Sequence, residues 1–215
     1  MAADRTRVPP GQIRTDRWPV LHAGSVPTDL TSERWNLVVH GEVERPATLT
    51  YRDLLSLPQK EILCDIHCVT SWSKLGMYWT GVPFTALAEL VAPKPDARFV
   101  VMECEQGFTT SLPLEALRED DVLVAHSVEG QPLPADHGGP VRMLVPKRYF
   151  YKSAKWLRGL KFVAVDEPGF WEVRGYSNIA DPWTEKRYDV DDVKVIHRMR
   201  KFSLFQPLRP KNDPP

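Results

Sequence analysis

Proline is the residue that most limits what this chain can fold into. The 215 residues include 20 prolines, and these are spread along the chain rather than gathered into one linker. Proline ends helices and removes a ladder hydrogen bond from a central strand. The spacing therefore predicts many short elements joined by rigid turns.

The hydrophobic pattern between the prolines predicts an α+β fold. Short helices are expected at 49–57, where Pro58 ends the helix, at 83–91 and at 114–117. Strands are expected at 35–43, 62–69, 99–104, 122–128, 141–145 and 160–165. Because strands and helices do not alternate regularly, we do not expect a doubly wound parallel sheet.

The composition is that of a globular protein. Hydrophobic residues make up 42% of the chain, charged residues make up 26%, and the formal net charge is zero, so neither a nucleic acid nor an anionic membrane is required as a partner. No apolar run approaches the roughly 20 residues of a membrane-spanning helix. The first residues lack the apolar core of a secretory signal, which predicts a cytoplasmic location. We expect a disordered N-terminus over 1–10, one domain over 11–185, and a tail over 186–215 that packs on the domain or is partly disordered.

One cysteine stands where an apolar run meets an aromatic-rich stretch. Cys68 ends the run, and Trp72, Tyr78 and Trp79 follow it together with two glycines. Loops are usually small and polar, because a buried loop must satisfy its own backbone. We interpret the stretch as a loop whose aromatic side chains wall a ligand held by the thiolate. A buried structural cysteine beside a surface tryptophan is the alternative.

A local charge asymmetry is the second strong feature. Between His137 and Val165 there are seven basic residues and no acidic residue. The basic residues are Arg142, Lys147, Arg148, Lys152, Lys155, Arg158 and Lys161. Two glycines precede Arg142; glycine lets a backbone approach a ligand, and arginine can clasp phosphate oxygens with two hydrogen bonds. The run predicts an anion site or a partner-facing patch. Interleaved aromatic residues also allow a nucleic-acid surface, and a solvated strand face is the plain alternative.

Both features resemble the sulfite oxidase family of molybdenum–molybdopterin oxidoreductases. The run Cys68-Val69-Thr70-Ser71-Trp72-Ser73, which leads to Trp79-Thr80-Gly81-Val82-Pro83, is similar to the family's metal-ligand segment, with Cys68 at the ligand position. The similarity covers about 18–188 and is closest to the small bacterial branch and to the methionine sulfoxide reductase catalytic subunits. It implies the mixed sulfite-oxidase-type molybdopterin-binding fold in a single domain.

The resemblance also implies roles for particular residues. Cys68 would bind molybdenum, and Tyr176, in a segment similar to the one that carries the active-site tyrosine of sulfite oxidases, would be catalytic. The residues implied to contact the molybdopterin are His22, Cys104, His137, Arg142, Ser153, Ala154 and Lys155. Cys104 has a plainer interpretation as a small buried residue.

The implied activity is a two-electron oxygen-atom transfer that uses molybdenum-molybdopterin. Sulfite oxidases carry arginines shortly after the ligand cysteine, whereas here the first basic residue after Cys68 is Lys74. Lysine is a point charge where arginine is a planar fork, so a small S- or N-oxide is expected in preference to sulfite. A separate electron-transfer partner is implied, because neither a haem domain nor an immunoglobulin-like dimerisation domain follows.

Two other classes of protein stay open from the sequence. Cys64, Cys68 and His67, together with His22, could be ligands of zinc, although strong zinc signatures have two closely spaced pairs. A Cys64–Cys68 disulfide is disfavoured in the cytosol. The second class is a non-catalytic module that binds an anion or a nucleic acid through 147–158, which would leave the Cys68 stretch unexplained.

Overall fold

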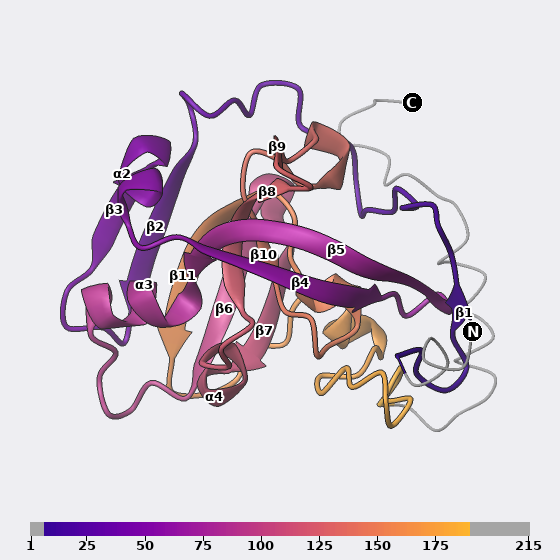
Figure 1. The fold of residues 1–215 in the computed structure, drawn as a ribbon. Helices are drawn as coiled ribbons and strands as arrows, with labels where there is room; N and C mark the ends of the chain where they lie inside the picture. The colour runs from indigo at the N-terminus through magenta and orange to yellow at the C-terminus, as the bar shows by residue number, and fades with distance from the viewer. Residues whose placement is uncertain (1–6, 190–215) are drawn as a thin grey trace, which may run out of the picture.

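The computed structural model describes residues 7–189 and contains two β-sheets whose strands cross one another (Figure 1). One sheet, in the order β3-β2-β11-β6-β7, consists of β2 (Asn36–Gly41), β3 (Ala47–Thr50), β6 (Phe99–Cys104), β7 (Thr109–Pro113) and β11 (Leu157–Val163). The other is built around the order β1-β5-β8-β10, with β4 on β5 and β9 on β8. Its strands are β1 (Ile13–Arg14), β4 (Lys60–His67), β5 (Trp72–Pro83), β8 (Leu123–Val128), β9 (Gln131–Pro132) and β10 (Arg142–Leu144).

The helices are short, as the proline spacing predicts. They are α2 (Tyr51–Ser56), α3 (Phe84–Val91) and α4 (Leu114–Leu117), together with the 3-10 turns η1 (Glu105–Gly107), η2 (Ala135–His137), η3 (Phe150–Lys152) and η4 (Glu172–Arg174). The helix expected over 49–57 begins later, because 47–50 forms β3. Thr50 and Asp53 then form a capping box that starts α2.

The aromatic stretch after Cys68 is a strand, and our interpretation of it as a loop is wrong. The loop is only the turn 68–71, closed by a 3.0 Å hydrogen bond from Ser71 N to Cys68 O. In β5, Met77 and Trp79 are buried while Tyr78 points outward, which is the alternation of a half-buried strand. At Gly81 an added Cβ would lie 2.4 Å from Val124 O, so glycine allows β5 to approach β8 closely.

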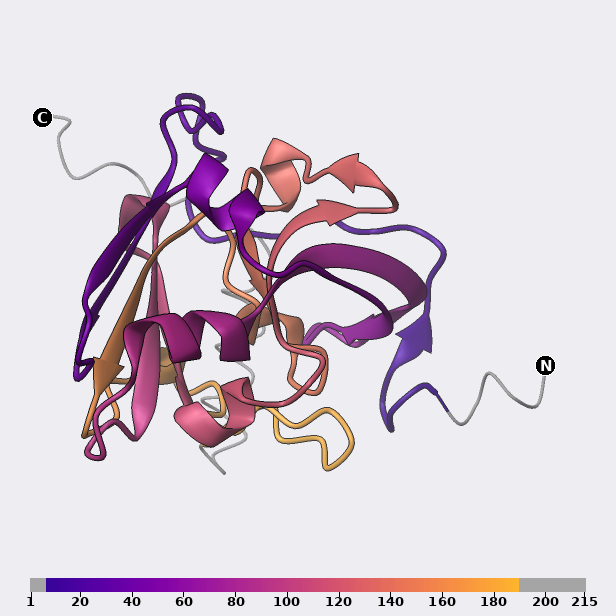
Figure 2. The ribbon, with the colours of Figure 1, turned by 60° about the vertical axis from the view of Figure 1, so that its left-hand side comes forward.

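The core lies between the sheets. Buried side chains from both sheets and from α3 form one large cluster, and a second cluster gathers around β4, β5 and β8 with Trp79 at its centre. In Figure 2, α3 and α4 lie together at one end of the sheets. In the described part of the chain, no helix is long and apolar enough to cross a membrane.

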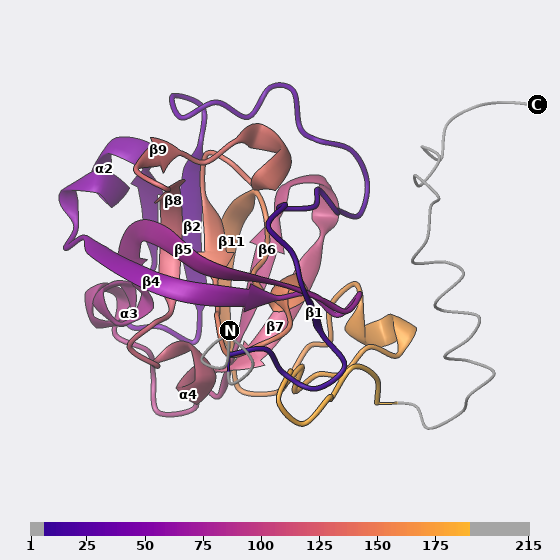
Figure 3. The ribbon, with the colours of Figure 1, turned by 45° about the vertical axis from the view of Figure 1, so that its right-hand side comes forward.

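Residues 169–189, which we call the C-terminal segment, lie beside the Cys68 turn at the edge of the sheets near β1 (Figure 3). Phe170 N donates to Thr109 O at 2.8 Å, which fixes the start of the segment on β7. Near its end, the Arg187 guanidinium donates to Val69 O at 2.5 Å. Residues 1–6 of the expected N-terminal stretch and 190–215 of the expected tail lie outside the described residues.

Candidate active site

The Cys68 thiol is free and almost entirely buried, with 9% of the residue exposed. Its Sγ lies 3.2 Å from Thr70 Oγ1, and Gln12 Nε2 donates to the Cys68 carbonyl at 3.1 Å. Burial raises the pKa of the thiol, while Thr70 and the positive charges of Arg187 and Lys155 oppose that shift. The fold therefore places a buried thiol near two cations from distant parts of the chain.

His137 lies in a stack of aromatic rings. Its imidazole stacks on Trp18 with ring centroids 3.6 Å apart, and Trp18 meets Trp79 edge-on at 5.4 Å. Burial, together with the nearby positive charge of Lys155, lowers the pKa of His137 to about 4. Nδ1 of His137 is buried without a hydrogen-bond partner among the described residues. A neutral, unsatisfied imidazole of this kind is ready to bond a ligand.

Arg142, 1% exposed, holds two loops together from β10. Its guanidinium donates to His137 O and to Ser153 O, each at 2.6 Å, and lies 4.2 Å from the Phe150 ring centroid. Burial lowers the pKa of Arg142 to about 9. The predicted pterin residues His137 and Ser153 are thus brought together by a third predicted residue.

The local absence of acids in the basic run is compensated in three dimensions. Five of the seven cations pair with carboxylates from elsewhere in the chain: Lys147 and Arg148 with Glu119, Lys152 with Glu172, Arg158 with Glu105, and Lys161 with Glu167. Within residues 7–189, only Arg142 and Lys155 of this run have no carboxylate within 4.0 Å. The run is therefore not a continuous basic patch, and its two unmatched cations lie at the candidate site.

Lys155 reaches the site from the turn that follows η3. Its Nζ donates to Asp136 O at 2.6 Å, and burial together with Arg142 lowers the pKa of Lys155 to about 7. Ser153 Oγ accepts from Val145 N at 2.9 Å, and Ala154 O accepts from Met143 N at 2.9 Å, so the turn 153–155 is fixed to β10.

Two predicted pterin residues lie around this centre in different environments. His22 is exposed, bonds Gly24 O at 3.0 Å, and meets the ring of Trp156 edge-on at 5.6 Å. Cys104 is buried in the larger core cluster, and burial raises the pKa of its thiol while Arg142 opposes that shift.

Tyr176 lies in an aromatic cluster of the C-terminal segment. Ring centroids are 5.6 Å from Tyr151, 5.0 Å from Trp171 and 5.1 Å from Tyr188. Sequence reasoning missed Arg187, which lies 11 positions later in the same segment and contacts the Cys68 turn. No local motif marks it, because its partners Val69 and Gly11 are distant in sequence.

The zinc interpretation lacks a ligand set. Among residues 7–189, no group of three or more His, Cys, Asp or Glu side chains could hold a metal ion. Cys64 and Cys68 are both free thiols, and Cys64 sits opposite Met77 in the β4–β5 pair. His67 is instead hydrogen-bonded through Nδ1 to Ser73 Oγ at 2.8 Å.

The match of a family model to most of the chain shows that this is an oxidoreductase of the molybdopterin-binding class. Residues 23–171 match the model of the family described as "Oxidoreductase molybdopterin binding domain". The chain belongs to this family, and its cofactor is molybdenum-molybdopterin.

Three relatives illustrate the range of the family. The Bacillus subtilis protein YuiH, named an uncharacterized oxidoreductase, is 44% identical over 86% of this chain and 93% of its own length. The protein-methionine-sulfoxide reductase catalytic subunit MsrP of Ralstonia nicotianae is 31% identical, over 75% of this chain and 54% of its own length. The sulfane dehydrogenase SoxCD of Paracoccus pantotrophus superposes with a TM-score of 0.59 at 25% identity, over 64% of this chain and 40% of that chain. The chain thus spans only about half of MsrP and less than half of SoxCD.

The residues at the site fit the cofactor of the family. The free Cys68 thiol is a soft ligand suited to a metal already bound by sulfur. The buried and unpartnered Nδ1 of His137 and Nε1 of Trp72 are polar atoms that a bound group can satisfy. Arg142 and Lys155 supply positive charge, and no carboxylate of the described residues lies within 4.0 Å of either.

Proposed function

We propose that the chain catalyses two-electron oxygen-atom transfer on a small S- or N-oxide, with Cys68 as the protein ligand of molybdenum. The observation that carries this proposal is the place of Lys155, which is close enough to act electrostatically on the buried Cys68 thiol, on His137 and on Arg142. When bound, the molybdenum-molybdopterin group supplies the redox chemistry itself, and the protein supplies orientation and electrostatics.

In this proposal the turn 153–155 and the loop at His137 hold the phosphate end of the cofactor. Lys155 and Arg142 favour an anion, because each is desolvated and has no carboxylate partner in the described part of the chain. His22, beside Trp156, and Cys104, beside Arg142, are placed at the edges of the same region. Ser153 and Ala154 contribute through their position on the turn.

Tyr176 is proposed to donate a hydrogen bond to a substrate oxygen. A phenolic hydroxyl is a donor of this kind, and a fixed donor aimed at developing negative charge stabilises a transition state. The support is its place in the C-terminal segment, which also brings Arg187 to the Cys68 turn.

The cations that follow Cys68 and those of the C-terminal segment are already bonded within the protein, which favours a substrate of low charge. Lys74 donates to Asp16 O at 3.1 Å, and Arg174 donates to Phe170 O at 2.6 Å and stacks on the Phe170 ring. Arg187 is held by Val69 O and lies 3.6 Å from a carboxylate oxygen of Glu185. Burying a dianion among cations that are already engaged costs several kcal/mol, whereas a neutral oxide needs one or two donors.

A separate electron-transfer partner completes the proposed cycle. The Ralstonia relative is named a catalytic subunit, which supports a protein partner for this chain as well. The cytoplasmic location expected from the N-terminal sequence stays a prediction.

Steady-state kinetics test the substrate class. With a reduced viologen as electron donor, we expect kcat/KM for at least one small sulfoxide or N-oxide to exceed kcat/KM for sulfite oxidation by about tenfold or more. The Tyr176→Phe variant should lose about tenfold in kcat, as expected for one lost hydrogen bond. Lys74→Met, which removes a half-buried cation that is already bonded to Asp16 O, is the control and should keep wild-type values.

A sulfite kcat/KM well above that of every oxide would contradict the proposed substrate. It would mean that Arg187 or the N-terminal arginines Arg14 and Arg17 form an anion pocket. Purified protein without stoichiometric molybdenum from a molybdenum-replete host would contradict the proposed ligand role of Cys68.

A further inference from the structure

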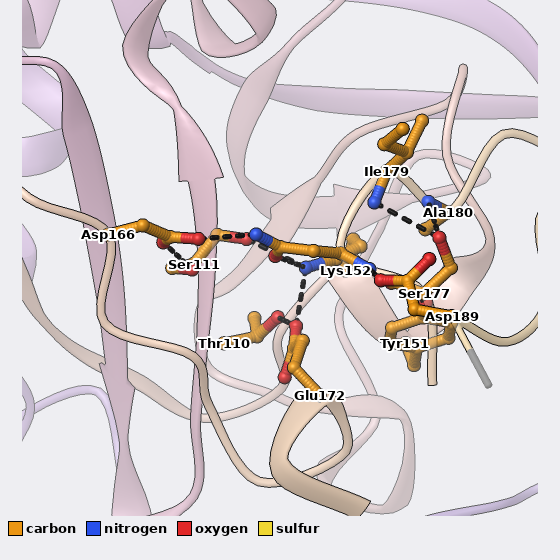
Figure 4. A network of polar contacts seen from close by, with 11 residues as sticks. Thr110, Ser111, Tyr151, Lys152, Asp166, Glu172, Ser177, Ile179, Ala180 and Asp189 are labelled. Carbon is orange, nitrogen blue, oxygen red and sulfur yellow. Dashed lines mark hydrogen bonds and ion pairs between the residues drawn. The ribbon is translucent and has the colours of Figure 1, made fainter. Parts of the chain in front are cut away.

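One lysine of the basic run is sealed inside the protein. The Lys152 side chain is 0% exposed, and the side chain of its partner Glu172 is 2% exposed. Lys152 Nζ donates to Glu172 Oε1, to Ser111 O at 2.8 Å and to Asn178 Oδ1 at 3.0 Å (Figure 4). An ammonium group has three N–H donors, so Lys152 is fully satisfied.

The acceptors of Lys152 are themselves tied to other strands. Thr110 Oγ1 donates to Glu172 Oε1 (Figure 4). Asn178 Nδ2 donates to Oδ2 of Asp166, and Oδ1 of the same carboxylate accepts from Ser111 Oγ at 2.6 Å. These contacts join β7, η3, the residues after β11 and the C-terminal segment. We call this set of six residues the Lys152 hub: Thr110, Ser111, Lys152, Asp166, Glu172 and Asn178.

The hub holds both sides of Tyr176. Glu172 lies four residues before Tyr176 and Asn178 lies two residues after it, and both bond the same ammonium. The neighbouring Tyr151 donates to Ser177 O and packs its ring against Tyr176. Two consecutive residues of η3 therefore clamp the loop that carries Tyr176.

The same turn leads directly to the proposed cofactor contacts. Lys152 is followed by Ser153, whose carbonyl accepts from Arg142 and whose hydroxyl accepts from Val145 N. The hub thus connects the Tyr176 loop to the turn 153–155 through adjacent residues. A displacement of Glu172 or Asn178 would move Tyr176 relative to that turn.

Stability alone does not explain a buried ion pair at this place. Replacing such a pair by apolar residues of similar volume is often neutral or stabilising. In addition, Glu172 Oε2 is buried without a hydrogen-bond partner in the described part of the chain, which is unfavourable. Directional hydrogen bonds, unlike apolar contacts, fix the relative position of the segments that they join.

We propose that Lys152 and Glu172 are positioning residues that hold the Tyr176 loop of the C-terminal segment against the turn 153–155. The consequence for catalysis rests on the proposed function of Tyr176. The positioning itself does not, and it is measurable without turnover.

Hydrogen exchange on the holoenzyme tests the positioning. The variant Lys152→Met/Glu172→Leu removes both charges and leaves no unpaired buried ion. The matched control is Lys161→Met/Glu167→Leu, which removes a more exposed pair, 2.8 Å apart, from the same basic run. We expect backbone amides of 169–180 to exchange about tenfold faster or more in the hub variant, with β8 unchanged, and no such change in the control.

Exchange that is unchanged at 169–180, or that rises equally in β8, would overturn the positioning role. If the double variant does not fold, Glu172→Gln keeps the shape and an acceptor for Lys152 and should give a smaller acceleration confined to 169–180. Unchanged exchange there would also overturn the proposal.

Kinetics then separate this inference from the function of the enzyme. If the hub acts through Tyr176, the loss in kcat caused by Lys152→Met/Glu172→Leu should disappear in a Tyr176→Phe background, because coupled residues are not additive. Fully additive losses would overturn action through Tyr176. A wild-type protein that shows the exchange result but no oxygen-atom transfer would refute the proposed function and leave the positioning intact.

Discussion

Replacing Lys155 with methionine tests the cofactor site with little damage to the fold. Lys155 Nζ makes one hydrogen bond, to Asp136 O, and has no carboxylate within 4.0 Å among residues 7–189. Methionine keeps most of the apolar stem and removes the charge. Because no ion pair is broken, we expect the melting temperature of the cofactor-free variant to equal or slightly exceed that of the wild type.

The expected loss appears in cofactor retention. A hydrogen bond from a charged donor contributes about 1.5–3 kcal/mol, which corresponds to about 10- to 150-fold weaker binding. Molybdenum content by elemental analysis and pterin content by fluorescence after oxidation, followed through serial dilution, measure this loss. The pKa of Lys155 lies near 7 in the cofactor-free protein, below its ordinary value of 10.5. The charged form therefore decreases above pH 7, and wild-type retention should weaken as the pH rises from 7, whereas Lys155→Met should lose this dependence.

Lys147→Met is the matched control. Lys147 belongs to the same run but is exposed and lies 2.7 Å from Glu119 and 3.6 Å from Asp121, so its loss should leave the cofactor content unchanged. Full occupancy in Lys155→Met after dilution, or equal losses in both variants, would refute the assignment of Lys155 to the anion site.

The remaining predictions concern the ligand, the acid stability and the fold. Cys68→Ser should abolish oxygen-atom transfer and the sulfur-to-metal absorption band while the fold survives, and Cys64→Ser should keep both; the reverse result would move the ligand to Cys64. His137 has a pKa near 4 when folded and 6.5 as a free side chain, so the unfolded state takes up its proton first and the cofactor-free protein loses stability between pH 6.5 and 4, by at most about 3 kcal/mol. His137→Phe should show a shallower loss of melting temperature over that range, and an identical slope would contradict the shift. Gly81→Ala places Cβ 2.4 Å from Val124 O and should destabilise by about 1–3 kcal/mol in thermal unfolding, with no effect expected if β5 were a loop.

Local sequence patterns predicted the helices and strands whose hydrophobic residues follow one clear pattern. The helical spacing after Pro83 and the apolar run at 99–102 correspond to α3 and to most of β6. Strand β5 was missed because its tryptophans and glycines resemble a ligand-binding loop, although Met77 and Trp79 alternate with outward-facing Tyr78. Strand β7 was missed because Thr110 and Ser111 are polar and yet buried. Their hydrogen bonds in the Lys152 hub explain this burial, and no local sequence pattern predicts those bonds.

The residues of the candidate site also fall into those that a local motif predicted and those that it could not predict. The residues that sequence reasoning selected around His137 and 153–155 lie on neighbouring loops joined by Arg142, so a short motif was sufficient to find them. Arg187 and the ring stack of Trp18 on His137 come from opposite ends of the domain. The carboxylates that neutralise most of the basic run are equally distant in sequence. Pairing across such distances is decided by the tertiary fold, and a charge count along the chain cannot show it.

Lys152 and Lys155 lie within four residues of each other but differ in their surroundings: the first is part of the structural framework and the second lies at the candidate site. Both lysines are withdrawn from water, which disfavours their charged forms and lowers the pKa of each. Lys152 donates to a carboxylate and to two further oxygen acceptors, so its positive charge is neutralised within the protein. Within residues 7–189, Lys155 bonds one carbonyl oxygen, and the partners of the Arg142 guanidinium are likewise carbonyl oxygens. Neutral acceptors leave the positive charge uncompensated in a medium of low dielectric constant, which favours an external anion at that position. The η3 turn and the residues that follow it therefore join a cation that organises the fold to the cation that we propose binds the cofactor.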